Sequence, residues 1–312
     1  MDRLSKGLLF ALLFALFLPM TGYGHSHGHS HSHSHSHDHG PVAAGDKDPA
    51  ILLVTFGTSI PRAQEAFVTI EQRVQAAFPD TEIRWAYTSS IVREKLAQNG
   101  TEIDSPEMAM ARLMEDGYDR VLVQSLHMIP GAEFHEVFVN TKLFEQMIGW
   151  RHNFDKVEVG YPLLGSTAAM DAVIQVILTH VIPRERQADE AVVLMGHGTH
   201  HPSDAIYFAM MYKAQQADAN MYVGSLSVSP SIEEIRDALV EKGIKKAYLI
   251  PLMTVAGDHA INDMAGDGKG SWKSVLTEVG IESVSVLKGL AEFDAIVDIW
   301  VENMKDIMEK LH

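Results

Sequence analysis

Residues 110–134 are MARLMEDGYDRVLVQSLHMIPGAEF, and residues 235–260 are IRDALVEKGIKKAYLIPLMTVAGDHA. Each segment runs from an amphipathic stretch, past a glycine that suits a helix end, into an apolar strand and then a glycine-containing loop. Another pair of segments repeats in the same order, with ILLVTFGTS at 51–59 and VVLMGHGTH at 192–200. Self-similarity of this kind predicts that one α/β unit occurs twice in the chain.

Short β-rich runs alternate with helical stretches from about Pro49 onward. Pro61 and the run Ser105-Pro106-Glu107 are typical helix starts. This alternation predicts an α/β fold with two similar doubly wound lobes and parallel sheets, at 49–187 and 188–312. The expected strands are 51–56, 82–88, 119–126, 156–163, 190–196, 220–228, 246–253 and 282–289.

Two histidines follow predicted strands of the second lobe, each close to a glycine. His197 lies in MGHG and His259 in VAGDHAINDM, and the internal alignment places Phe56 opposite His197 and Glu133 opposite His259. A lone histidine at a strand end is usually a capping or packing residue. Ligands of open α/β sheets bind at the carboxyl ends of the strands, so two such loops predict a shared site in a cleft between the lobes. A pair of neutral imidazoles there suits Co, Ni, Fe or Zn.

Composition limits the classes of function. The 312 residues carry a net charge of −16, which argues against a nucleic-acid partner, and 46% of them are hydrophobic. The chain has no cysteine, which excludes disulfides and thiolate metal sites. Any metal ion must therefore be held by His, Asp or Glu.

The first 24 residues have the pattern of a secretory signal peptide. Arg3 and Lys6 precede the apolar run GLLFALLFALFLPM, and Gly22 and Gly24 suit a cleavage site before His25. The apolar run is shorter than the roughly 20 residues that span a bilayer. We expect export to the periplasm and no stable membrane anchor after processing; a retained anchor is the alternative.

Residues 25–48 contain eight histidines, most of which alternate with serine or glycine. This composition cannot form a core, so we expect a disordered segment. Histidine-rich tracts bind transition metals loosely, which predicts a metal-collecting role. The alternative is that the tract is an expression tag without a function of its own.

Four segments carry a resemblance to a known family. VTFGTS, QSLHMIPGAEF, VLMGHGTHH and PLMTVAGDHAINDMAGDGKGSWK resemble the class II chelatases, and more closely the anaerobic sirohydrochlorin cobaltochelatases of cobalamin synthesis, in a periplasmic variant. The resemblance covers about residues 50–310. It implies two α/β lobes around a tetrapyrrole cleft, and a lyase that inserts Co²⁺, or alternatively Fe²⁺ or Ni²⁺, into sirohydrochlorin. No nucleotide is expected, and the sequence has no GxxxxGK[ST] loop.

The resemblance also implies roles for individual residues. His197 and His259 match the metal-facing histidines, His197 also matches the proton acceptor, and Glu133 matches an acidic residue that faces the same cleft. The family has a further metal-binding glutamate near the end of the strand that follows His197. Here Ser227 stands at that place, and no carboxylate occurs before Glu233. The third ligand stays open between water, Glu133 and a substrate nitrogen.

The carboxylates of a tetrapyrrole need partners in an acidic protein. Backbone N–H groups after the first strand and at a helix start suit these carboxylates. His127 either lines the cleft or is a buried, hydrogen-bonded residue. The expected substrate-binding residues are Phe56, Gly57, Thr58, Ser59, Ser89 and His127.

Two other functions fit an exported two-lobed chain. One is a non-catalytic carrier of metal or tetrapyrrole, which would bind stoichiometrically without turnover. The other is a solute-binding receptor, which the two glycine-flanked histidines disfavour. Association with further copies of the same chain stays open.

Overall fold

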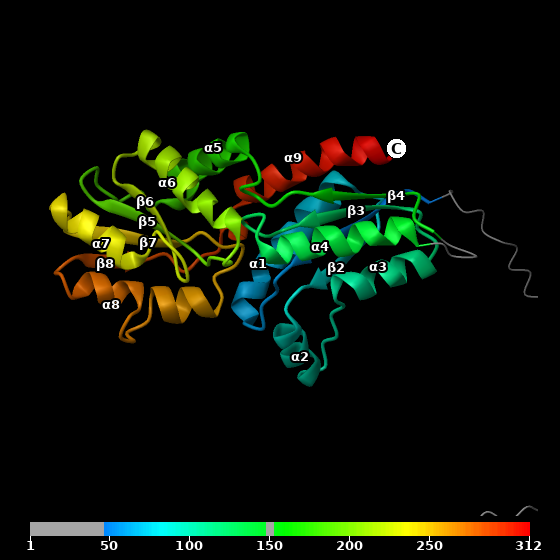
Figure 1. Ribbon diagram of the computed structural model, residues 1–312, viewed down its shortest axis with the longest axis horizontal. Coiled ribbons are helices and arrows are strands. Elements are labelled where there is room, and N and C mark those ends of the chain that lie inside the picture. Colours follow the sequence, from blue (N-terminus) through cyan, green and yellow to red (C-terminus); the bar gives the residue numbers. More distant parts are fainter. Residues whose placement is uncertain (1–46, 148–152) are drawn as a thin grey trace, which may run out of the picture. The chain divides into compact units, whose positions relative to one another are not determined.

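The computed structural model describes residues 47–147 and 153–312. The predictions for the signal segment and for nearly all of the histidine-rich segment fall outside the described residues. Two four-stranded parallel sheets share one strand order, β2-β1-β3-β4 in the first and β6-β5-β7-β8 in the second (Figure 1). The strands are β1 Ala50–Thr55, β2 Ile83–Tyr87, β3 Arg120–Ser125, β4 Lys156–Gly160, β5 Ala191–Gly196, β6 Met221–Ser225, β7 Lys246–Pro251 and β8 Glu282–Ser285.

Helices connect the strands and begin where the sequence predicts. Pro61 is the first residue of α1, and the Ser105 side chain caps α3 by accepting a hydrogen bond from Met108 N at 3.3 Å. The helices are α1 Pro61–Ala77, α2 Ser90–Gln98, α3 Pro106–Glu115, α4 Ala132–Leu143, α5 Thr167–Val176, α6 Ala205–Ala217, α7 Ile232–Glu241, α8 Trp272–Thr277 and α9 Asp294–Leu311. Short 3₁₀ or π-helical turns lie at Phe144–Gln146, Ile177–Val181, Pro202–Asp204, Ala260–Met264 and Leu290–Glu292.

The first sheet is buried on both faces, which explains the unbroken apolar runs of its central strands. Ile51 and Leu53 of β1 belong to the core that contains residues of α1 and α9. Leu52 and Val54 point to the other face and pack with residues of α3 and α4. The eight predicted strands and their parallel arrangement are confirmed.

The two lobes exchange helices. Helix α5 follows β4 of the first sheet in sequence but lies beside α6, over the second sheet, whereas α9 returns from the second lobe to cover β3 and β4 (Figure 1). Ion pairs fix this return, because Arg73 of α1 contacts both Asp298 and, at 3.1 Å, Asp294 of α9. Helices α7 and α8 cover the other face of the second sheet. One apolar core therefore contains residues of both sheets.

Equivalent hydrogen bonds confirm the internal alignment. Helix α4 and the helical turn after β7 each begin with a bond to a glycine carbonyl, from His135 N to Gly131 O (3.0 Å) and from Ile261 N to Gly257 O (3.2 Å). Glu133 and His259 are each the second residue of these helical segments. The two residues thus occupy the same position in the two halves.

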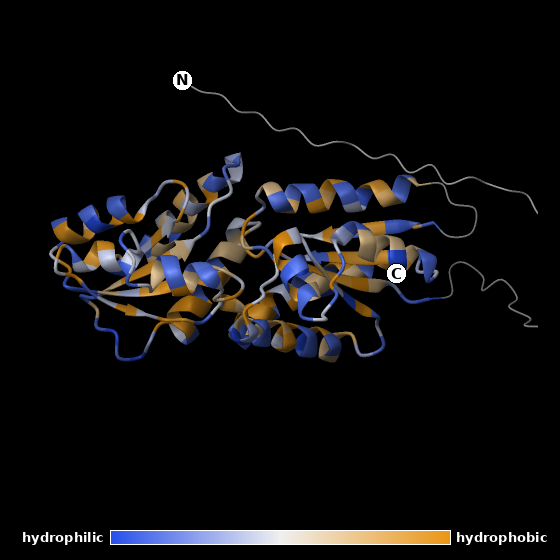
Figure 2. Cartoon of the chain, turned by 90° about the horizontal axis from the view of Figure 1, so that it is seen from below, coloured by the Kyte–Doolittle hydropathy of each residue, from blue (hydrophilic) through white to orange (hydrophobic). Residues whose placement is uncertain are grey.

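Hydropathy follows this layering. Figure 2 shows hydrophobic residues concentrated on the central strands and on parts of the surrounding helices. Over residues 47–147 and 153–312, the structure contains no helix with the length and apolar character that crossing a bilayer requires.

Candidate metal and proton-transfer site

The structure brings His197 and His259 together. His197 is the first residue after β5, and His259 lies in the helical segment that follows β7, the neighbouring strand. The two ring centroids are 4.7 Å apart, with an interplanar angle of 66°. His197 is exposed and His259 is partly exposed, so the pair is open to an incoming ion.

Each ring has one nitrogen bound to an acceptor. Nδ1 of His197 lies 2.6 Å from the carbonyl oxygen of Gly198, and Nδ1 of His259 lies 2.7 Å from Oδ2 of Asp263. Since a carbonyl and a carboxylate only accept hydrogen bonds, both Nδ1 atoms must carry the proton. Nε2 of each neutral ring then keeps its lone pair. Metal-binding histidines have this arrangement, in which the second nitrogen donates to a carbonyl or carboxylate.

Neighbouring groups hold the His197 loop. Gly198 has φ +85°, a left-handed conformation that glycine adopts without strain, and its N–H donates to the Tyr207 hydroxyl at 3.0 Å. Burial raises the pKa of Tyr207 to about 12, so this hydroxyl stays neutral. Ser227 donates its hydroxyl proton to the carbonyl oxygen of His197 at 2.7 Å. Ser227, which stands where the resemblance implies a ligand glutamate, therefore helps to position His197.

The pair could supply two protein ligands to a metal ion. Among residues 47–147 and 153–312, no group of three or more His, Asp or Glu side chains is placed to hold one ion. An ion held by this pair would take its other ligands from water or an incoming substrate, as in metal sites that keep open positions.

Glu133 belongs to a polar network in the first lobe. Its Oε2 lies 3.2 Å from Nε2 of His127 and 3.3 Å from the Thr88 hydroxyl, while Nδ1 of His127 lies 2.9 Å from the Ser125 hydroxyl. The His127 side chain is only 12% exposed, against 45% for Glu133. His127 is thus a mostly buried, hydrogen-bonded residue that contacts the more exposed carboxylate of Glu133, and its expected role in lining the cleft stays a prediction. Thr88 and Ser125 were not predicted from the sequence, since single hydroxyl residues carry no motif.

Contacts between the lobes place these loops next to each other. Thr254, in the loop after β7, donates its hydroxyl proton to the Leu126 carbonyl after β3 at 2.6 Å. Gly131 lies against Thr199, such that a Cβ atom added to Gly131 would be 2.5 Å from Cγ2 of Thr199. The carboxyl ends of the two sheets therefore meet, and the helix that carries Glu133 begins beside the loop that carries His197.

The expected substrate-binding residues lie after the carboxyl ends of three strands: Phe56, Gly57, Thr58 and Ser59 after β1, Ser89 after β2 and His127 after β3. Phe56 has 47% of its surface exposed, whereas Thr58 is buried. The Ser89 side chain caps α2, and the Ser89 N–H already donates to the Phe56 carbonyl at 3.3 Å. The Ser89 backbone N–H is therefore already engaged within the chain.

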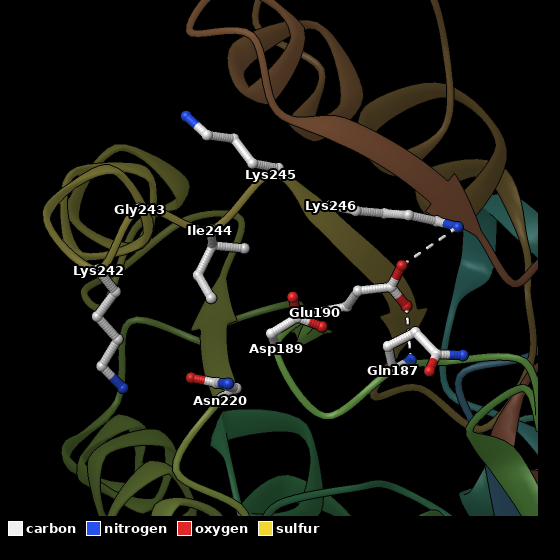
Figure 3. Close-up of a pocket in the computed structure, with 9 residues that line it drawn as sticks. All are labelled: Gln187, Asp189, Glu190, Asn220, Lys242, Gly243, Ile244, Lys245 and Lys246. Carbon is white, nitrogen blue, oxygen red and sulfur yellow. Dashed lines mark hydrogen bonds and ion pairs between the residues drawn. The ribbon is translucent and has the colours of Figure 1, made fainter.

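A surface pocket of the second lobe lies away from these residues (Figure 3). Its lining residues precede β5, β6 and β7, apart from Lys246, which is the first residue of β7. The pocket is therefore at the amino ends of these strands, opposite the edge that carries His197 and His259. It contains none of the site residues predicted from the sequence. The lining residues are Gln187, Asp189, Glu190, Asn220, Lys242, Gly243, Ile244, Lys245 and Lys246.

Comparisons with known proteins agree on one family. The family model described as cobalt chelatase (CbiK) matches residues 49–309. The chain is 36% identical to sirohydrochlorin cobaltochelatase CbiKC of Nitratidesulfovibrio vulgaris over 254 residues, which is 81% of this chain and 88% of the relative. It is also 36% identical to the sirohydrochlorin cobaltochelatase of Salmonella typhimurium over 259 residues, 82% of this chain and 94% of that one. The solved structure of SirB from Bacillus subtilis with Fe³⁺ covers 83% of this chain and 95% of its own, with a TM-score of 0.55 and 13% identity, and so supports the fold.

Proposed function

Because the chain belongs to the cobalt chelatase (CbiK) family, we propose that it is an enzyme that inserts Co²⁺ into sirohydrochlorin. The relatives support the substrate and the reaction, since the chain is 36% identical to two sirohydrochlorin cobaltochelatases over most of its length. The finer assignment of residues rests on the geometry of the site.

His197 and His259 hold the incoming ion. The observation that carries this assignment is that both Nδ1 atoms are bound to acceptors, at 2.6 Å and 2.7 Å, while two Nε2 lone pairs stay available on rings 4.7 Å apart. Two imidazoles bind a divalent ion more weakly than the four nitrogens of a macrocycle. The pair can therefore concentrate the ion and then release it.

Insertion of Co²⁺ releases two pyrrole protons. As the ion moves to the nitrogens of the macrocycle, Nε2 of His197 recovers its lone pair and accepts one proton. Glu133 accepts the other at its carboxylate. His127 donates from Nε2 to this carboxylate at 3.2 Å and restricts its orientation.

The reaction needs no nucleotide. The bonds between the ion and the four nitrogens of the macrocycle replace the bonds that the ion made to water and to the two histidines. Co²⁺ is the ion that the family favours. Fe²⁺ and Ni²⁺ are alternative substrates that a bis-histidine site accepts, because imidazole suits all three ions.

The test is turnover. Purified protein is mixed with excess sirohydrochlorin and Co²⁺, Fe²⁺ or Ni²⁺ in parallel, without nucleotide, and product is followed by its absorption spectrum. Multiple turnovers per chain with Co²⁺ support the enzyme. Product limited to one equivalent per chain would instead identify a carrier of metal or tetrapyrrole.

We also propose export to the periplasm, with residues 1–24 as the signal peptide and residues 25–48 as a collector of metal ions. The support comes from the sequence pattern. Mass spectrometry of the protein from its native host should find an N-terminus near His25, and an intact Met1 in the membrane fraction would refute export. Removal of His25–His39 should lower the rate at scarce Co²⁺ and not at saturating Co²⁺.

A further inference from the structure

A second pair of histidines faces across the two lobes. His135 of α4 and His201 of the loop after β5 have ring centroids 6.2 Å apart, and their planes are inclined by only 29°. His135 is exposed and His201 is half-buried. His201 lies in the same loop as His197, and His135 lies in the same helical turn as Glu133, so this pair borders the proposed metal and proton-transfer site.

Both residues are held by fixed backbone. His135 N donates to the carbonyl of Gly131, the residue that packs against Thr199. On the other side, the Asp204 carboxylate accepts hydrogen bonds from Thr199 N at 2.9 Å and from His201 N at 3.0 Å.

His200 adds a backbone feature that favours a function for this loop. It has φ +53°, a conformation that is uncommon for residues other than glycine and that concentrates at functional sites. His200 directly precedes His201, whose ring lies next to the ring of His135 in α4.

The ring nitrogens leave room for an ion. In the described part of the chain, the His135 ring has no hydrogen-bond partner, and Nδ1 of His201 faces Ser203, with Oγ at 3.0 Å and backbone N at 3.3 Å. When a metal takes Nε2 of His201, Nδ1 carries the proton and donates it to the Ser203 hydroxyl, at the expense of the longer contact from Ser203 N. Metal–nitrogen bonds of about 2.1 Å place two ligating nitrogens at most about 4.2 Å apart. Rings with centroids 6.2 Å apart come within this limit when one nitrogen of each ring lies on the rim that faces the other ring.

We infer that His135 and His201 form a second site for a divalent transition-metal ion, bridging the two lobes, from which the ion passes to His197 and His259. The metal-site assignment stands on its own geometry, whereas the transfer role rests on the proposed chelatase function. Two imidazoles with water in the other positions give the weak, exchangeable binding that a transfer site needs. The Asp204 carboxylate, which accepts a hydrogen bond from His201 N at 3.0 Å, favours a cation over an anion.

Metal stoichiometry tests the inference. The probe is Co²⁺ alone, bound by equilibrium dialysis to the full chain in which the eight histidines of residues 25–39 are replaced by serine. We expect two ions per chain in this parent, one in His135→Phe and one in His201→Phe. Phenylalanine keeps an aromatic ring for stacking and removes the ligating nitrogen, so it separates coordination from ring packing. The matched control, His180→Phe, alters an exposed histidine outside both pairs and should keep two ions.

Two further readouts decide the outcome if a phenylalanine variant folds poorly. His135→Gln, at an exposed helical position, should also lose one ion while its thermal unfolding in the absence of metal matches that of the parent. In turnover, the same variants should raise the Co²⁺ concentration for half-maximal rate more than they lower the maximal rate. One ion per chain in the parent, or two ions in both His135 variants, overturns the site. Two ions per chain without any turnover of sirohydrochlorin would overturn the proposed function and leave the metal site standing.

Discussion

Replacement of Asp263 by asparagine tests whether the carboxylate behind His259 tunes a metal ligand. Asp263 accepts the Nδ1 proton of His259 at 2.7 Å, a contact that fixes the ring orientation and leaves Nε2 as the metal-binding nitrogen. Loss of such a partner typically weakens metal binding about 10- to 100-fold. Both side chains are about half exposed, at 45% and 50%, so solvent screening favours the lower end. We therefore expect about tenfold weaker Co²⁺ binding, equivalent to about 1.4 kcal/mol.

The assay is calorimetric titration of Co²⁺ into Asp263→Asn and into the control Asp267→Asn. Asp267 lies four positions further along, is exposed, and pairs with Lys273 at 2.7 Å instead of a histidine. Both variants remove one negative charge. A difference in Co²⁺ affinity between them therefore measures the contact with His259 and not the loss of negative charge from the surface. We expect a change of less than about twofold in Asp267→Asn, because exposed charges are screened.

A double variant tests whether Asp263 affects Co²⁺ binding through His259. In a His259→Ala background, Asp263→Asn should cause no further loss of Co²⁺ affinity, because the residue that it acts through is gone. Equal weakening in the two aspartate variants, or a full additional loss in the His259→Ala background, would refute the reasoning.

His197→Ala and His259→Ala should each weaken Co²⁺ binding strongly, and the double variant should add little, because one ion needs both ligands; additive losses in the same titration would contradict a shared ion. Glu133→Gln should lower the maximal rate of sirohydrochlorin metallation by more than about tenfold and change Co²⁺ affinity little, a split that initial rates and titration measure side by side. Gly131→Ala should reduce the free energy of unfolding by about 1–3 kcal/mol in urea denaturation, since its Cβ would overlap the loop that carries His197. Gly268→Ala, which has open space around it, is the control and should be close to neutral.

The sequence predicted the strands and the pairing of the two histidines because both depend on local patterns. Apolar runs mark buried strands, and the repeat places His197 and His259 after neighbouring strands. The alignment of Glu133 with His259 needed only two glycines at equal spacing, and the helix starts confirm it.

Other features depend on contacts that no local pattern records. Ser227 was recognised as a departure from the family, but its bond to the His197 carbonyl depends on how two loops pack. The Asp263 contact with His259 follows from the helical turn after β7, which the sequence did not define. The exchange of α5 and α9 between the lobes was also not predicted. The apolar face of an amphipathic helix does not indicate which sheet the helix covers.

The return of α9 to the first sheet determines when that lobe can close during synthesis. All four strands of the first sheet are made early, yet α9, the last helix of the structure, covers part of one face of this sheet. Arg120 of β3 donates a hydrogen bond to the Leu311 carbonyl of α9 at 3.1 Å. A nascent chain therefore cannot bury the part of this face over β3 and β4 until Asp294–Leu311 has left the ribosome. The early half should stay open and available to chaperones, and a chain cut before Asp294 should expose the apolar face of β3 and β4.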